Sequence, residues 1–133
     1  MATYSLSALQ TFVSTHQSDP FWIGVDVHKR SYHIALLSAD NKTFTFATTA
    51  SPDAFIEQLI RLEIPIAGVA YEAGPTGFGL ARALMLEKIP VMVAAPSKIP
   101  RSVSAGAKTD RLDCLKLAHY AAKGMIRPIA IPT

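Results

Sequence analysis

The first half of the chain has the apolar patterning of buried β-strands. Three runs show it, at residues 21–27, 32–37 and 43–48. The first run is almost continuously apolar, which is typical of a strand covered on both faces, and Asp26 interrupts it. Short polar connections at residues 28–30 and 40–41 separate the runs. We therefore expect three strands joined by hairpins.

Helical periodicity follows these strands. Ser51 and Pro52 supply an N-cap and a first-turn proline. One apolar face is then predicted from Phe55, Ile56, Leu59 and Ile60. The later elements are predicted as a strand at 66–71, a helix from the turn at 73–77 to about 88, a strand at 90–95 and a helix at 110–123.

This order of elements favours one folded domain. Hairpin strands followed by helix, strand, helix, strand and helix predict an α/β fold of RNase H-like type, a mixed five-stranded sheet with helices packed on it. The chain has 133 residues, half of them hydrophobic, which suffices for one core. We expect the domain at 21–126, after an arm or short helix at 1–20 and before a tail at 127–133.

The composition excludes several classes of protein. A single cysteine, Cys114, cannot form an internal disulfide and leaves no cysteine cluster for structural zinc, which fits a reducing compartment. Charge, proline or glycine interrupts each apolar stretch before the ~20 residues that a membrane span needs, and the N-terminus lacks a signal-peptide pattern. We expect a cytoplasmic protein.

Positive charge is concentrated in the second half of the chain. The net charge is +3, and residues 82–133 contain nine of the thirteen Lys and Arg residues against three acids. This asymmetry is typical of a surface that contacts a nucleic-acid backbone, although a solvated basic face would look the same. Four cations near the last helix are candidate DNA contacts: Lys98, Arg101, Lys108 and Arg111.

Asp26 is an unusual residue for a buried strand. Burial of a carboxylate is costly unless the group is paired, hydrogen-bonded or bound to a metal. Strand alternation places Asp26 on the same face as Trp22 and Gly24, and Gly24 is expected to leave space there for a substrate backbone. The alternative is an aspartate that only caps the hairpin.

Three further acids are candidates for the same site. Glu72 follows the fourth strand, and ligands bind at the carboxyl ends of parallel strands. Asp110 and Asp113 stand three residues apart at the predicted start of the last helix, hence on one side of it. In the alternative interpretation Glu72 is a solvated strand end and Asp110 is only an N-cap.

Four converging carboxylates require cations. Charges ~4 Å apart repel by several kcal/mol, and oxygen ligands favour Mg²⁺ or Mn²⁺. Two such ions can activate an attacking oxygen and stabilise a leaving one, which suits phosphodiester chemistry. We interpret His28 mainly as a hairpin residue and Cys114 as core. The turn at 74–77 suits a phosphate at a helix N-terminus, although a glycine turn can also serve only to reverse the chain.

Four segments resemble the DEDD transposases of insertion-sequence family one-hundred-ten, which are related to Piv-type invertases. They are residues 23–29 (Ile-Gly-Val-Asp-Val-His-Lys), 71–77 (Tyr-Glu-Ala-Gly-Pro-Thr-Gly), 95–101 (Ala-Pro-Ser-Lys-Ile-Pro-Arg) and 108–113 (Lys-Thr-Asp-Arg-Leu-Asp). The resemblance runs from about residue 21 to 128. It implies that the catalytic, metal-binding acids are Asp26, Glu72, Asp110 and Asp113.

The resemblance also implies a RuvC-like domain and a DNA substrate. Members of the family are longer and have a C-terminal domain with a serine nucleophile, so we expect the tail at 127–133 to lead to an absent domain. The family further implies a bridging RNA and homo-oligomers. Cys114 and Pro90 stand where the family often has alanine and glycine, and neither is a proposed ligand.

Two alternative functions remain open. An actin-like or sugar-kinase ATPase lobe also begins with such a hairpin, but it grips phosphate with glycine after the acid, where this chain has Val27 and His28. A noncatalytic nucleic-acid-binding module of the same fold would use only the basic half of the chain.

Overall fold

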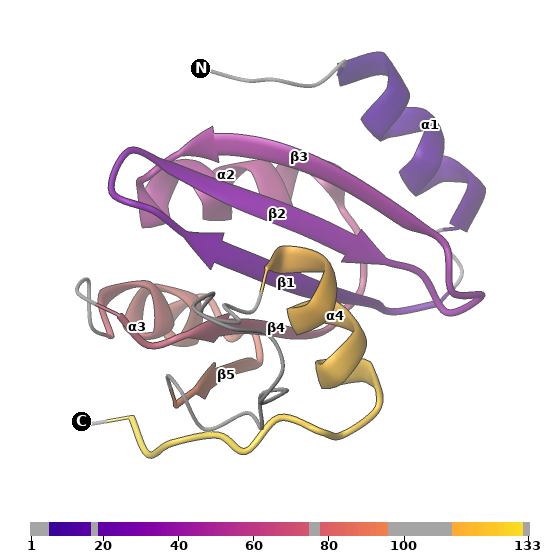
Figure 1. Cartoon of the computed structure of the whole chain (residues 1–133). Helices are drawn as coiled ribbons and strands as arrows, with labels where there is room; N and C mark the ends of the chain where they lie inside the picture. Colours follow the sequence, from indigo (N-terminus) through magenta and orange to yellow (C-terminus); the bar gives the residue numbers. More distant parts are fainter. Residues whose placement is uncertain (1–5, 17–18, 75–77, 96–112, 132–133) are drawn as a thin grey trace, which may run out of the picture.

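A mixed five-stranded sheet forms the centre of the protein in the computed structural model, which describes residues 6–16, 19–74, 78–95 and 113–131 (Figure 1). Its strands are β1 (Phe21–Val27), β2 (Ser31–Leu37), β3 (Thr43–Thr49), β4 (Ile66–Glu72) and β5 (Val91–Ala94). The strand order is β3-β2-β1-β4-β5, with β1 antiparallel to β2 and parallel to β4. This is the α/β, RNase H-like arrangement that the order of elements predicted.

Helices cover both faces of the sheet (Figure 1). They are α1 (Leu6–His16), α2 (Pro52–Leu62), α3 (Gly79–Leu86) and α4 (Cys114–Ala122). The predicted alternation along β1 is confirmed. Ile23 and Val25 belong to the larger core, which also includes residues of α2 and α3, whereas Trp22 packs in the smaller clusters with residues of α4. Within the described residues, no helix combines the length and apolar content needed to cross a membrane.

Helix α2 begins where the sequence predicted. The backbone of Ser51 is extended, and its side chain accepts a hydrogen bond from the N–H of Ala54 at 3.2 Å. Phe55 and Leu59 are buried, as expected. Ile60 was also predicted on the buried face, and this prediction was wrong, because Ile60 is 55% exposed. Ile60 lies at the margin of α2 toward α3, where it lines a groove.

Helix α4 begins later than predicted. We expected it to start at Asp110, but its first residue is Cys114 and Asp113 is the N-cap. The Asp113 side chain accepts a hydrogen bond from the N–H of Lys116 at 2.8 Å, which satisfies one of the unpaired donors of the first turn. Asp113 therefore precedes the helix, and the prediction that it shares a helical side with Asp110 is not supported. Asp110 itself lies outside the described residues.

The chain after α4 returns to the sheet (Figure 1). Pro128 forms an antiparallel bridge with Ala94, and the N–H of Ile129 donates to the carbonyl oxygen of Val93 at 2.9 Å. Ile131 packs against the larger core. This part of the predicted tail therefore lies along the edge of β5.

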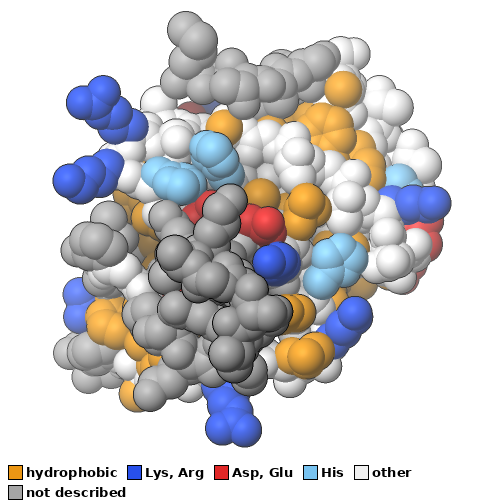
Figure 2. Space-filling model, viewed as in Figure 1, with side chains coloured by type: hydrophobic (Ala, Val, Ile, Leu, Met, Phe, Trp, Pro, Cys, Tyr) orange, Lys and Arg blue, Asp and Glu red, His pale blue; other side chains and the backbone are white. Residues whose placement is uncertain are grey.

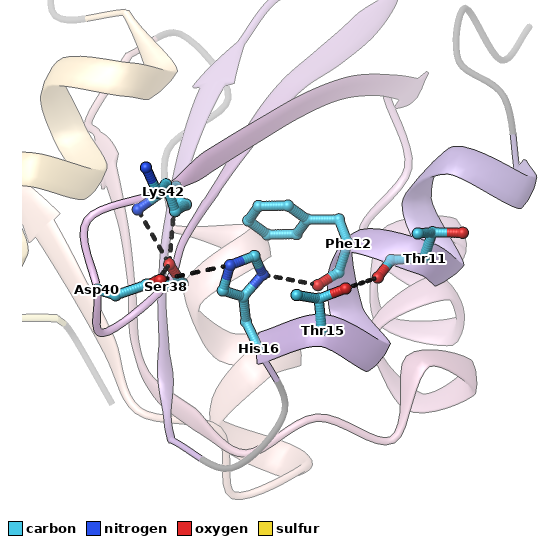
Figure 3. A network of polar contacts seen from close by, with 7 residues as sticks. All are labelled: Thr11, Phe12, Thr15, His16, Ser38, Asp40 and Lys42. Atoms are coloured by element: carbon cyan, nitrogen blue, oxygen red, sulfur yellow. Dashed lines mark hydrogen bonds and ion pairs between the residues drawn. The ribbon is translucent and has the colours of Figure 1, made fainter.

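Helix α1 is joined to the β2–β3 turn by polar contacts (Figure 3). Nε2 of His16 lies 3.5 Å from Oδ2 of Asp40. The buried hydroxyl of Ser38 donates to Oδ1 of Asp40 and accepts a hydrogen bond from the N–H of Lys42. The His16 ring also packs against Phe12, with 4.6 Å between ring centroids. The weak helical pattern in the first twenty residues is thus a real helix with a defined docking position.

Candidate functional site

Asp26 and Glu72 lie at the carboxyl ends of two neighbouring parallel strands. In the register of β1 and β4, Gly24 is opposite Ala70 and Val25 is opposite Tyr71. Asp26 and Glu72 are the next residue along each strand, so the usual spacing of strands puts their backbones about 5 Å apart. Because side chains alternate, both carboxylates share the face of Gly24 and Ala70, which is the face that α4 covers.

The Asp26 carboxylate is largely buried and lies beside histidines. Its side chain is 14% exposed, and Oδ2 lies 3.0 Å from Nε2 of His28. His33 is the cross-strand neighbour of Asp26 on β2, and its ring centroid is 4.8 Å from that of His28. Figure 2 shows acidic side chains adjoining histidine side chains on this face of the molecule. The buried carboxylate therefore has a donor that balances part of its cost of burial.

The start of α4 is pressed against β1 at Gly24. A Cβ atom on Gly24 would overlap the carbonyl oxygen of Cys114 and lie 2.6 Å from the backbone nitrogen of Ala118. Our expectation that Gly24 leaves space for a substrate was therefore wrong, because the backbone of α4 fills that space. The close approach instead brings Asp113, one residue before Cys114, to the face of the sheet that holds Asp26.

The thiol of Cys114 lies close enough to Asp26 and Asp113 for both charges to act on its pKa. Burial, and to a smaller extent the negative charges of Asp113 and Asp26, together raise its pKa to about 11. The residue is 9% exposed, which confirms the interpretation of Cys114 as a core residue. Asp26 and Asp113 therefore contribute to one local electrostatic environment.

The described residues contain only part of the predicted site. Asp113 is exposed, and Oδ1 of its side chain is engaged with the N–H of Lys116. Within the part of the chain that the structure describes, no three His, Cys, Asp or Glu side chains form a group ready to hold a metal ion. Five predicted site residues lie outside that part: Lys98, Arg101, Lys108, Asp110 and Arg111.

Sequence reasoning did not identify His33 and gave His28 a mainly structural role. The β1–β2 hairpin was the feature of the sequence that could have identified His33. Since the connection after β1 is short, the residue facing Asp26 on β2 can be counted from the turn, and it is His33. His28 lies two residues beyond Asp26, which alternation places on the same face.

Comparisons with known proteins point to transposases. Residues 23–133 match the model of the IS110 DEDD family, which is described as transposase. The transposase for insertion sequence element IS1533 from Leptospira borgpetersenii is 35% identical over 103 residues, which are 74% of this chain and 30% of the relative. The protein named "Putative transposase y4qE" from Sinorhizobium fredii is 30% identical over 116 residues, which are 84% of this chain. The chain spans 30% of the length of both relatives.

Proposed function

This chain belongs to the IS110 family of DEDD transposases, and we propose that its RNase H-like domain carries the phosphodiester chemistry of DNA transposition. The proposed catalytic and metal-binding residues are Asp26, Glu72, Asp110 and Asp113. The proposed substrate is DNA, whose backbone offers phosphate oxygens to the same ions that the carboxylates bind.

The observation that carries the proposal is the position of Asp26 and Glu72, each one residue beyond the paired residues Val25 and Tyr71 of adjacent parallel strands. Two carboxylates on one face of adjacent parallel strands repel each other and gain stability from a shared cation. Their position at the carboxyl ends of the strands is where α/β sheets bind ligands. Asp113 approaches the same face from α4, since Gly24 allows the two backbones to meet.

The donor set fits a hard divalent ion. Carboxylate oxygens suit Mg²⁺ or Mn²⁺ better than zinc, which favours nitrogen and sulfur. A bound ion of this kind supplies activation of an attacking oxygen and stabilisation of a leaving one. Asp113 fits with one restriction: Oδ1 is held by the N–H of Lys116, so Oδ2 is the oxygen that we assign to the site.

His28 is proposed to orient Asp26. The 3.0 Å contact from Nε2 to Oδ2 fixes one oxygen of the carboxylate and directs the other away from the imidazole. A ligand held by such an outer partner binds metal more tightly, by roughly tenfold or more. His28 is therefore a positioning residue in this proposal, since it acts through Asp26.

Binding of the substrate is assigned to the basic second half of the chain. We propose that Lys98, Arg101, Lys108 and Arg111 contact the DNA backbone close to the carboxylates, because they are near Asp110 and Asp113 in the sequence.

A bridging RNA and assembly into homo-oligomers are proposed for the complete transposase, in line with the family resemblance.

A Mn²⁺ titration, followed by the loss of the electron paramagnetic resonance signal of free Mn²⁺, tests the proposal. We expect saturable binding to the chain, a loss of roughly tenfold or more in affinity for Asp26→Ala and Asp26→Asn, and no change for Asp19→Ala, which removes an exposed acid. Thermal unfolding of each variant controls for folding. Unchanged Mn²⁺ affinity in a folded Asp26→Asn variant would contradict the proposal.

Binding of duplex or branched DNA separates the proposal from its alternatives. A noncatalytic binding module would bind DNA equally well in EDTA and would be indifferent to Asp26→Ala. An ATPase lobe would bind ATP specifically, whereas the transposase proposal expects no such preference.

A further inference from the structure

We propose that the groove between α2 and α3 is a docking surface for a cationic amphipathic helix of a partner protein. Helices α2 and α3, whose residues line the groove, lie on the opposite side of the sheet from α4 (Figure 1). A helix bound there would not compete with a substrate at Asp26 and Glu72, which share the face that α4 covers. The surface is therefore independent of the proposed metal chemistry.

Two adjoining cavities form the groove. The larger, of about 380 Å³, lies between α2 and α3 and is lined in part by Ile60 and Leu86. The smaller, of about 200 Å³, is lined in part by Ile64, which follows the end of α2. Ile60 and Glu87 line both cavities, so the two cavities adjoin.

Large apolar side chains border this hollow without being covered. Leu86 is 83% exposed and Ile60 is 55% exposed, on opposite helices of the same groove. Single exposed apolar residues are common, but here two of them face one cavity. Removal of both from water would contribute to binding, and they provide anchors on two sides of an inserted helix.

The rim of the groove is acidic, although the whole chain is basic. Four acids line the two cavities: Asp53, Glu57, Glu63 and Glu87. Among the described residues that line them, Arg61 is the one cation, and it pairs with Glu57 at 3.6 Å. Four negative charges less one positive charge leave a net charge of −3 around the groove, against +3 for the chain.

The sign of this charge selects the occupant. An acidic rim repels nucleic acid and anionic lipid, whose phosphates are negative. A second copy bound through the same face would set these acids against themselves, because a two-fold interface pairs identical surfaces. A helix with leucines on one side and lysines or arginines beside them matches both the apolar floor and the acidic rim.

A labelled synthetic peptide tests the inference. The probe is a fluorescein-labelled peptide of about four helical turns, with leucine at positions i, i+3, i+4 and i+7 and lysine elsewhere. We expect fluorescence anisotropy to show saturable binding to the complete chain. Leu86→Ser and Ile60→Ser should each weaken it roughly tenfold or more, as expected when an apolar anchor is lost.

Matched variants and peptides distinguish binding at this site from nonspecific hydrophobic or electrostatic binding. Met125→Ser removes a side chain of similar exposure, 59%, after α4, and should leave binding unchanged. Glu87→Lys should weaken binding of the cationic peptide and reduce its sensitivity to salt.

Three results would overturn the inference. The first is equal binding by a peptide of the same composition whose leucines are scrambled off one face. The second is equal binding by a version with glutamate in place of lysine. The third is peptide binding that is equally strong in a folded Leu86→Ser variant and in the unmodified chain.

Discussion

The hydroxyl group of Tyr71 accepts a hydrogen bond from the backbone N–H of Ala81, with 3.1 Å between the two atoms. Ala81 lies in the first turn of α3, where N–H groups have no partner within the helix, and the N-cap residue Phe78 provides no side-chain hydrogen bond. Tyr71 is fully buried and immediately precedes Glu72. Its hydroxyl therefore ties α3 to the strand that carries a candidate site residue.

Tyr71→Phe should destabilise the protein without leaving a cavity in the core. The ring would be retained, but the N–H of Ala81 would lose this acceptor in a buried environment. We expect the free energy of unfolding in urea to fall by about 1–2 kcal/mol. Tyr120→Phe, at a half-buried position on α4, should change it by less than about 0.5 kcal/mol. Equal losses in the two variants would argue against a capping role for Tyr71.

Gly24→Ala should displace α4 from the sheet. The added methyl group would overlap the carbonyl oxygen of Cys114, and backbone cannot rotate away as a side chain can. Overpacking of this kind typically costs about 1–3 kcal/mol. Because α4 brings Asp113 to the face of Asp26, we also expect weaker Mn²⁺ binding, measured at a temperature where the variant is folded.

Gly79→Ala is the matched control. Nothing lies within 4 Å of a Cβ atom at this first residue of α3, and alanine favours helix. Stability should stay the same or rise slightly, and Mn²⁺ affinity should not change. If Gly24→Ala behaved like Gly79→Ala, close packing of α4 on β1 would not be what positions Asp113.

The sequence predicts the sheet well because strand patterning is a local property. The apolar run of β1, the Thr and Phe alternation of β3 and the cap of α2 at Ser51 each depend on a few neighbouring residues. The start of α4 was not predicted, since Asp110 and Asp113 are both good N-cap residues. The choice between them depends on tertiary packing, in which Cys114 meets Gly24.

The candidate site is predictable to the extent that strand register is. Asp26 and Glu72 were identified from burial and from strand ends, and the parallel pairing of β1 with β4 makes them neighbours. Gly24 was wrongly predicted to leave space for a substrate. Glycine has no Cβ atom, so the sequence does not distinguish close approach of a substrate from close approach of a helix. His33 escaped notice because its relation to Asp26 is defined across a hairpin.

Alkaline pH should destabilise the protein in part through Cys114. A thiol whose pKa is raised on folding holds its proton more tightly in the folded chain. Its stabilising contribution is complete below pH 9, the ordinary value being 9.0, and is lost as pH rises toward about 11. In urea unfolding at about pH 7 and about pH 10, the stability advantage of the unmodified chain over Cys114→Ala should shrink at the higher pH. A constant difference would contradict this expectation.

Asp40→Ala should loosen α1. Asp40 has a lowered pKa, first because the Ser38 hydroxyl donates to it and also because His16 and Lys42 are close. A carboxyl with a lowered folded pKa stabilises above its ordinary value of 3.8 and loses this effect as pH falls through the folded value. At neutral pH we expect faster amide hydrogen exchange in α1 and unchanged exchange in α2. Glu57→Ala, an exposed change on α2, should leave α1 unaffected.

The most direct test of the central claim is a double-mutant cycle on Mn²⁺ affinity with Asp26→Asn, Glu72→Gln and the combined variant. If the two carboxylates share one ion, each single change should lower affinity roughly tenfold or more, and the combined loss should differ from the sum of the single losses in free energy. Independent, additive losses, or a single variant with unchanged affinity, would show that Asp26 and Glu72 do not form one metal site.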